Sequence, residues 1–152
     1  MADNIDEHQF LLEVLRGDEA AVNFCEVLFR ISQIADDLYD KDKEVTRKEV
    51  EEVFWLALVQ LPNHPFYQKH FSYLQPLIQA VYVDWMDANV MERSGNEQDK
   101  RASYILRDSV GCMAVHVAYL VGGFEWGKVV GAKIRRFIYD EPFDQYVEGF
   151  EK

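Results

Sequence analysis

The chain has 152 residues, of which 49% are hydrophobic and 14% aromatic, and this is enough apolar material for the core of a single folded domain. Its 27 acidic and 16 basic residues give a formal net charge of −11. This charge argues against unaided binding to nucleic acid, because phosphate backbones carry the same sign. It is compatible with an acidic inhibitor that mimics nucleic acid.

Three features predict a cytoplasmic protein without a transmembrane segment. The first ten residues are acidic and lack the basic and apolar regions of a signal peptide. The uncharged run over residues 109–124, which no other uncharged run exceeds in length, is shorter than the roughly 20 apolar residues that cross a bilayer. The two cysteines, Cys25 and Cys112, lie in apolar stretches without CxxC spacing, so we interpret them as reduced core residues.

Apolar residues recur at spacings of three and four while glycine and proline are scarce, which predicts helix nearly throughout. Asp6 and Asp18 are expected to cap the first two helices, and the sequence from Thr46 to Glu49 is a capping box for the third. We predict helices over residues 7–16, 18–43, 46–60, 76–93 and 100–121, the fifth of which ends at Gly122 and Gly123, with a short helix or turn over 64–73. A sixth helix is expected to follow and to reach Tyr139. Gly127 and Gly131 are expected to break the last helix.

The predicted fold is all-α, with residues 1–152 forming one domain, a compact bundle of five to seven helices. We find no internal repeat, low-complexity segment or interdomain linker. The tail, residues 140–152, mixes acidic and aromatic residues. It has two alternatives: docking on a partner, or packing against its own bundle.

The segment QIADDLYDKD, residues 33–42, concentrates four aspartates at the end of the second predicted helix. A turn of about 100° per residue places Asp36 and Asp40 at the margin of the face opposite the apolar stripe, with Asp37 farther round. By geometry alone, this cluster is a solvated helix end.

The predicted helix over residues 76–93 is apolar nearly all round, so we expect it to be central in the bundle. Asp84 projects into its apolar arc, and Asp87 lies about one turn further on. An unpaired carboxylate there would cost several kcal/mol, so Asp84 is expected to have a partner: a metal ion, an arginine or a hydrogen-bond network.

The predicted helix over residues 100–121 carries a polar seam. Asp108, Cys112 and His116 are spaced at i, i+4 and i+8 and therefore align on one face. Together with Asp84 this seam predicts a polar pocket between two central helices, although a histidine in a core is more often a satisfied hydrogen-bonding group than a ligand.

The order of these motifs resembles the squalene and phytoene synthase family of isoprenoid synthases. The stretch FCEVLFRISQIADDLYD is similar to the family helix that carries the first aspartate-rich motif, DDxxD, which falls here on Asp36, Asp37 and Asp40. The stretch LIQAVYVDWMDANVMERSGNEQDKRASYILRDSVGCM is similar to the family segment in which a helical aspartate, a tyrosine and a Val-Gly-x-Met turn follow one another. Asp84, Tyr104 and residues 109–113 take those positions.

The resemblance implies an all-α cavity in which aspartates hold Mg²⁺ and the ions bind the diphosphate of a prenyl substrate. The candidate metal ligands are Asp36, Asp37, Asp40, Asp84 and Asp87, and the candidate substrate-binding residues are Tyr104, Asp108 and His116. The chain lacks a counterpart of the family's second aspartate-rich motif and has Arg107 and Asp108 where the family has small residues. Three alternatives follow: binding of a diphosphate ligand without catalysis, a homodimer that completes the site, or loss of the chemistry.

Two other functions fit the same residues. In an all-α nucleotide pyrophosphohydrolase, the pairs Glu49 with Glu52 and Asp84 with Asp87 would hold Mg²⁺. In a non-enzymatic acidic interaction protein, Asp84, Asp108 and His116 would only fix the register of the helices. The sequence leaves open whether the protein is an enzyme.

Overall fold

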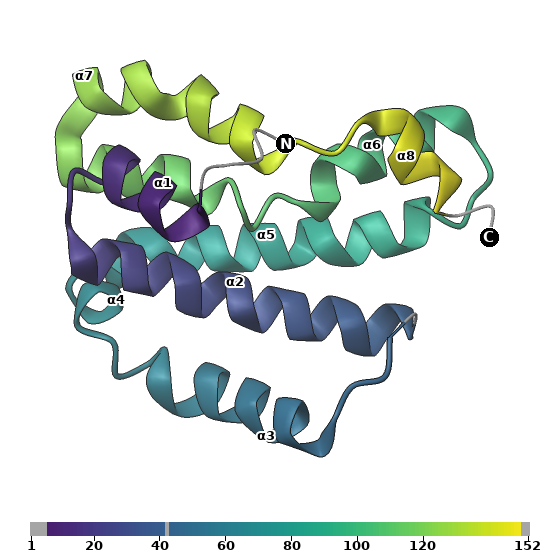
Figure 1. Ribbon diagram of the computed structural model, residues 1–152, viewed down its shortest axis with the longest axis horizontal. Coiled ribbons are helices and arrows are strands. Elements are labelled where there is room, and N and C mark those ends of the chain that lie inside the picture. The colour runs from purple at the N-terminus through teal and green to yellow at the C-terminus, as the bar shows by residue number, and fades with distance from the viewer. Residues whose placement is uncertain (1–5, 42, 150–152) are drawn as a thin grey trace.

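The computed structural model describes residues 6–41 and 43–149, and every regular element in these ranges is a helix, as predicted (Figure 1). In chain order, the elements are α1 (Glu7–Val14), α2 (Glu19–Asp40), α3 (Arg47–Trp55), the π-helical segment η1 (Leu56–Gln60), α4 (Pro65–Lys69), α5 (Phe71–Met91), α6 (Glu97–Arg107), α7 (Met113–Ile138) and α8 (Phe143–Glu148).

Local capping interactions set the beginnings of the first three helices. Asp6 accepts a hydrogen bond from the backbone N–H of His8 at 3.2 Å, and Asp18 accepts one from Ala21 at 3.0 Å. The capping box is formed in both directions, since the Thr46 hydroxyl accepts from the Glu49 N–H at 3.1 Å and the Glu49 carboxylate accepts from the Thr46 N–H at 3.3 Å. The predicted caps are therefore confirmed.

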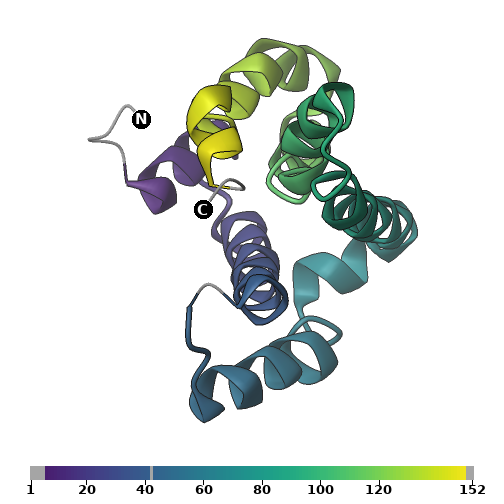
Figure 2. The same cartoon turned by 90° about the vertical axis from the view of Figure 1, so that its right-hand side faces the viewer.

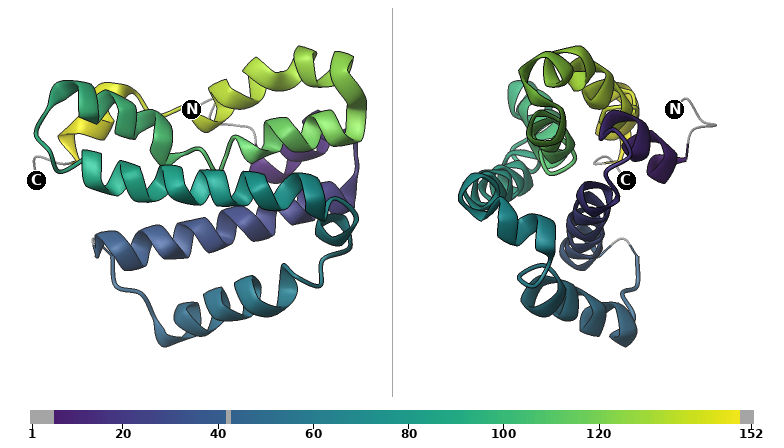
Figure 3. Two further views of the ribbon diagram at one scale, coloured as in Figure 1. Left: turned by 180° about the vertical axis from the view of Figure 1, so that it is seen from behind. Right: turned by 90° about the vertical axis from the view of Figure 1, so that its left-hand side faces the viewer.

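Helix α2 packs against helices on both of its sides. It contacts α3 on one side and α1 and α7 on the other (Figure 1). Its side chains Phe24, Cys25 and Ile34 are inaccessible to solvent and belong to the core formed with α1, α4 and α7. Helix α1 and the pair formed by α5 and α6 lie at opposite sides of the molecule (Figures 2 and 3).

Helix α7 reverses its direction at Gly123, which has φ +82° and ψ −177°. Only glycine adopts this backbone conformation without strain. The predicted break at this glycine is confirmed, but the predicted break at Gly127 and Gly131 is wrong, because the helix continues through both to Ile138. Gly127 instead leaves room for Tyr119, whose ring would lie 2.4 Å from an added Cβ.

The predicted continuous helix over residues 100–121 is also wrong. Residues 108–112 form a series of turns between α6 and α7, with i to i−3 hydrogen bonds such as Gly111 N–H to the Asp108 carbonyl at 3.0 Å. Gly111 packs directly against Ile138, whose Cγ2 would lie 2.7 Å from an added Cβ. This close contact with the end of α7 takes the place of a straight helix, and it depends on residues far apart in the sequence.

Helix α5 differs most from expectation. It begins at Phe71, so Pro76 lies inside it and not in its first turn. It also lies at the surface. From its composition we expected a central position, in which the helix would have been buried on all sides. The outward side chains are Tyr82, Val83, Met86 and Val90, which are 57%, 41%, 42% and 70% exposed. None of the helices in the described ranges has the length and hydropathy needed to cross a bilayer.

Candidate functional site

The most highly connected polar group in the described part of the chain is the Arg107 guanidinium, at the end of α6. It donates to both carboxylate oxygens of Glu92, with Nη2 to Oε2 at 2.8 Å, to the Asn89 amide oxygen, and to Asp36 Oδ1 at 2.9 Å. Asp40 Oδ2 lies 4.0 Å from Nη1. The Arg107 side chain is only 11% exposed, and that of Glu92 only 14%. These bonds tie α2, α5 and α6 together.

A second set of hydrogen bonds surrounds Arg107 and its partners Glu92 and Asp36. Trp85 Nε1 donates to Asp36 Oδ1 at 2.5 Å, and the Tyr146 hydroxyl donates to Glu92 Oε1 at 2.7 Å. Ser103 Oγ lies 2.9 Å from the same tyrosine hydroxyl, which brings α8 into the cluster. We call this cluster the Arg107 network; its members are Asp36, Trp85, Asn89, Glu92, Ser103, Arg107 and Tyr146.

Burial and charge shift the pKa values of the groups in and beside the network. Burial opposes the charged form of Arg107, but the hydrogen bonds with Glu92 and the nearby carboxylates outweigh it and raise the Arg107 pKa above its ordinary value. Burial raises the pKa of Asp36, more than Trp85 and Arg107 lower it. Burial, together with the negative charge of Asp36, raises the pKa of Asp108 to about 6.

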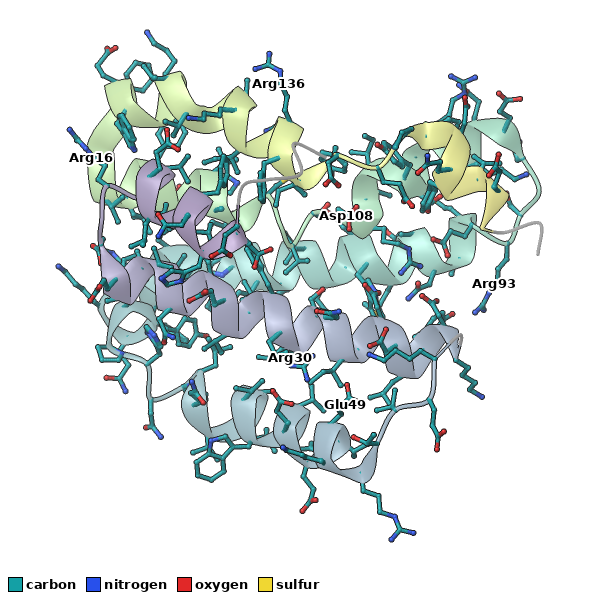
Figure 4. All side chains as sticks on the ribbon, in the orientation of Figure 1. Arg16, Arg30, Glu49, Arg93, Asp108 and Arg136 are labelled. Carbon is teal, nitrogen blue, oxygen red and sulfur yellow. The ribbon has the colours of Figure 1, made fainter. Side chains whose placement is uncertain are left out.

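A pocket of about 880 Å³ adjoins the network between the ends of α2, α5, α6 and α8. Its charged lining residues are Asp40, Glu92, Arg93, Lys100, Arg107 and Glu141. Figure 4 shows Arg93 at the far end of α5 and Asp108 where α6 gives way to α7. The donors of Arg107 are directed at protein acceptors, so a ligand here would have to displace those bonds to reach the guanidinium.

Comparisons with protein-family models, with curated proteins and with solved structures give no match to this chain.

The predicted metal ligands do not come together. Asp36 and Asp40 face Arg107, whereas Asp37 lies 3.3 Å from Lys43 Nζ. Within residues 6–41 and 43–149, no group of three or more histidine, cysteine, aspartate or glutamate side chains is arranged to hold a metal ion. Beside the DDxxD motif, the Arg107 guanidinium brings a positive charge to Asp36 and Asp40.

The environment of Asp84 differs most clearly from the prediction. We expected its carboxylate to be enclosed by hydrocarbon and neutralised by a partner. The structure leaves Asp84 half-buried and Asp87 exposed, and neither forms a hydrogen bond or ion pair with another described residue. The reason is the surface position of α5, which lets water solvate a side chain that a central helix would have buried.

The predicted substrate-binding residues also separate. Tyr104 packs against Phe143 and Tyr146, with ring centroids 5.4 and 5.1 Å apart, and donates a hydrogen bond to the Glu141 carbonyl. These contacts hold α8 on α6, so within residues 140–149 the tail packs against its own bundle; residues 150–152 lie outside the described residues.

The predicted seam of Asp108, Cys112 and His116 does not run along one continuous helix, because residues 108–112 form turns between α6 and α7. His116 lies instead in a separate groove beside Tyr73, with ring centroids 6.4 Å apart. Cys112 lies with its Sγ 3.9 Å from the Tyr139 hydroxyl.

Sequence reasoning noticed Arg107 only as a departure from a family pattern, and it missed Trp85, Glu92 and Tyr146. One local signal was present: Glu92 lies just before the short loop SGNEQDK, and Arg107, of opposite charge, lies about two turns into the predicted helix that follows it. A helical hairpin of this kind brings the residues near its loop close enough to pair.

Proposed function

We propose that this protein is a non-enzymatic helical interaction protein that binds a basic partner protein through the outer face of α5. The observation that carries the proposal is the exposure of Tyr82, Val83, Met86 and Val90 on one helix. A contiguous apolar face on a helix surface is typical of a site that is covered by another chain. Fully burying a side chain such as Val90 contributes roughly 1.5–3 kcal/mol, so a few of them suffice as anchors.

The charge of the partner follows from two further side chains of α5. Asp84 and Asp87 lie on the same helix as the apolar face and have no cationic partner among the described residues. The whole chain carries a formal net charge of −11. A partner that offers lysine or arginine side chains around an apolar anchor would therefore be attracted at long range by both carboxylates. On binding it would pair with Asp87, which lies one turn from Val83 and from Val90 on the helix.

The Arg107 network supports a structural role for the motif that suggested catalysis. Its carboxylates are bound to a guanidinium, an indole and a phenol of the same chain, an arrangement that holds four helices in register. Buried polar groups of this kind fix one arrangement of packed elements when all of them are satisfied. No buried side-chain nitrogen or oxygen of the described residues lacks a hydrogen-bond partner.

Site-specific photo-crosslinking in the source cells tests the proposal. A photoreactive residue at position 90 should capture one basic protein, whereas the same residue at position 129 should not. Val129 is a matched control because it is 69% exposed, close to the 70% of Val90, but lies on α7. The double change Asp84→Asn with Asp87→Asn should weaken the captured complex, and added salt should weaken the unchanged complex more than this variant.

Three results would contradict the proposal. The first is capture of the same proteins from both positions, which would indicate nonspecific contact. The second is capture of a second copy of this chain alone, which would indicate a homodimer. The third is capture of an acidic protein, because Asp84 and Asp87 would then repel the partner that α5 holds.

A further inference from the structure

A second groove shares no lining residue with the pocket at the Arg107 network and has a different character. The two halves of α7, which fold back on each other at Gly123, form it together with the beginning of α5. Its volume is about 550 Å³, and its lining includes Tyr73, His116, Tyr119, Lys128, Gly131 and Arg135. Pockets of roughly 300–1,000 Å³ accommodate small-molecule ligands, so the groove has room for one of moderate size.

The groove is positively charged in a strongly acidic protein. Lys128 and Arg135 line it, and no carboxylate does. Arg135 forms no ion pair with another described residue, and its side-chain hydrogen bond is with Cys112. Lys128 lies over the Phe124 ring and pairs with Glu125 in a long surface contact at 3.5 Å, which contributes little. An anion that enters the groove therefore meets a guanidinium without a carboxylate partner among the described residues and an ammonium with a weak one.

Gly131 has no packing reason to be glycine. An added Cβ at this position would meet only Val115 Cγ1, at 3.6 Å, which is ordinary van der Waals contact. Gly127 differs, since Tyr119 occupies the space of its missing side chain. A glycine inside a helix destabilises it relative to alanine, so the open space over Gly131 keeps the floor of the groove clear at the expense of helix stability.

Aromatic rings complete the groove. Tyr73 is exposed at its edge and Tyr119 is half-buried, so both present ring surface to an occupant. Burial, with a contribution from the positive charge of Arg135, lowers the pKa of His116 and favours its neutral ring. A neutral imidazole offers one donor and one acceptor.

From this combination of cations, aromatic rings and a cleared floor, we infer that the groove binds a mononucleotide, with the base against the tyrosines and the phosphate at Lys128 and Arg135. Aromatic faces stack on any base, and a guanidinium binds phosphate oxygens in a bidentate manner. The groove shares no residue with the partner surface formed by Tyr82, Val83, Met86 and Val90. It contains His116, which the sequence predicted to bind substrate.

Isothermal titration of the full chain with AMP, GMP, CMP and UMP, in buffer containing EDTA, tests the inference. At least one nucleotide should bind with a Kd below 1 mM, and adenosine and inorganic phosphate should each bind more weakly than AMP. Arg135→Gln should weaken binding by about tenfold or more, since it removes a charge-assisted contact. Gly131→Ala should raise the melting temperature while weakening binding, which separates loss of the site from loss of the fold.

Arg136→Gln is the matched control, because Arg136 follows Arg135 on the same helix but lies on its outer side (Figure 4). It should leave the Kd unchanged. The inference is overturned if no nucleotide binds at 1 mM, if Arg135→Gln and Gly131→Ala both bind as the unchanged chain does, or if inorganic phosphate binds as tightly as AMP, since the rings would then have no part in recognition.

Discussion

Replacing Arg107 with methionine removes the guanidinium from the Arg107 network while keeping most of its hydrocarbon stem. Glu92 then loses both of its charge-assisted hydrogen bonds from Arg107 and keeps only the Tyr146 hydroxyl, and Asp36 keeps only Trp85. Breaking a buried pair on one side destabilises a protein by roughly 3–5 kcal/mol, because a charge is left without compensation.

The lower end of that range applies here. Glu92 is well buried at 14% exposure, but Asp36 is 30% exposed and recovers part of its solvation from water. We therefore expect a loss of about 3 kcal/mol in the free energy of unfolding at pH 7. In a chain of this length, roughly 2–4 °C in melting temperature correspond to each kcal/mol, so the expected fall is about 6–12 °C.

Urea unfolding followed by circular dichroism measures this loss. Arg101→Met is the matched control on the same helix: its pair with Glu97 is exposed, at 60% and 72%, and its removal should change stability by less than about 0.5 kcal/mol. Adding Glu92→Gln to Arg107→Met should restore part of the loss, since it removes the orphaned charge. A loss below about 1 kcal/mol for Arg107→Met, or no recovery in the double variant, would refute the assignment of the network as the polar bond between these helices.

Three further outcomes are expected. Asp108→Asn should raise the free energy of unfolding at pH 7 by about 1 kcal/mol. The pKa of Asp108 is about 6 in the folded state, above its unfolded value, so its ionisation at neutral pH favours the unfolded state. Unfolding curves should show that the gain disappears near pH 4, and a gain independent of pH would contradict the prediction. Gly123→Ala should lower the free energy of unfolding by about 1–3 kcal/mol, because alanine is strained at φ +82°. An added Cβ would meet no atom within 4 Å, so the loss comes from the backbone conformation and not from a clash. An unchanged melting temperature would argue against the reversal of α7. Mg²⁺ with inorganic diphosphate, the ligand that the family resemblance implies, should leave the melting temperature unchanged because Arg107 already faces Asp36 and Asp40, whereas a rise that Asp36→Asn abolishes would support the metal site.

Interactions between residues within one turn of a helix could be predicted from the sequence. The capping aspartates Asp6 and Asp18 and the capping box at Thr46 bond to backbone groups two or three residues away, so the residues that make these bonds stand next to each other in the chain. The all-α class follows from the same short-range information, because an apolar spacing of three and four is a property of a single segment.

The position of each helix in the fold could not be predicted from the sequence, because an apolar helix face does not identify the element that covers it. Helix α5 has the composition of a buried helix but has its outer face exposed, and this alone turns Asp84 from an enclosed charge into a solvated one. In the same way, the turns at residues 108–112 include Gly111, on which Ile138 packs, and this contact joins residues 27 positions apart.

The sequence by itself determined that this chain is helical, where its first helices begin, and that its DDxxD aspartates lie on one helix. Only the tertiary structure decided what those aspartates bind. Arg107 is 71 residues from Asp36 and 15 from Glu92, and its choice of partners depends on how α2, α5 and α6 pack together. A charge has no preference among carboxylates until packing brings some of them close and removes the water that would otherwise solvate them.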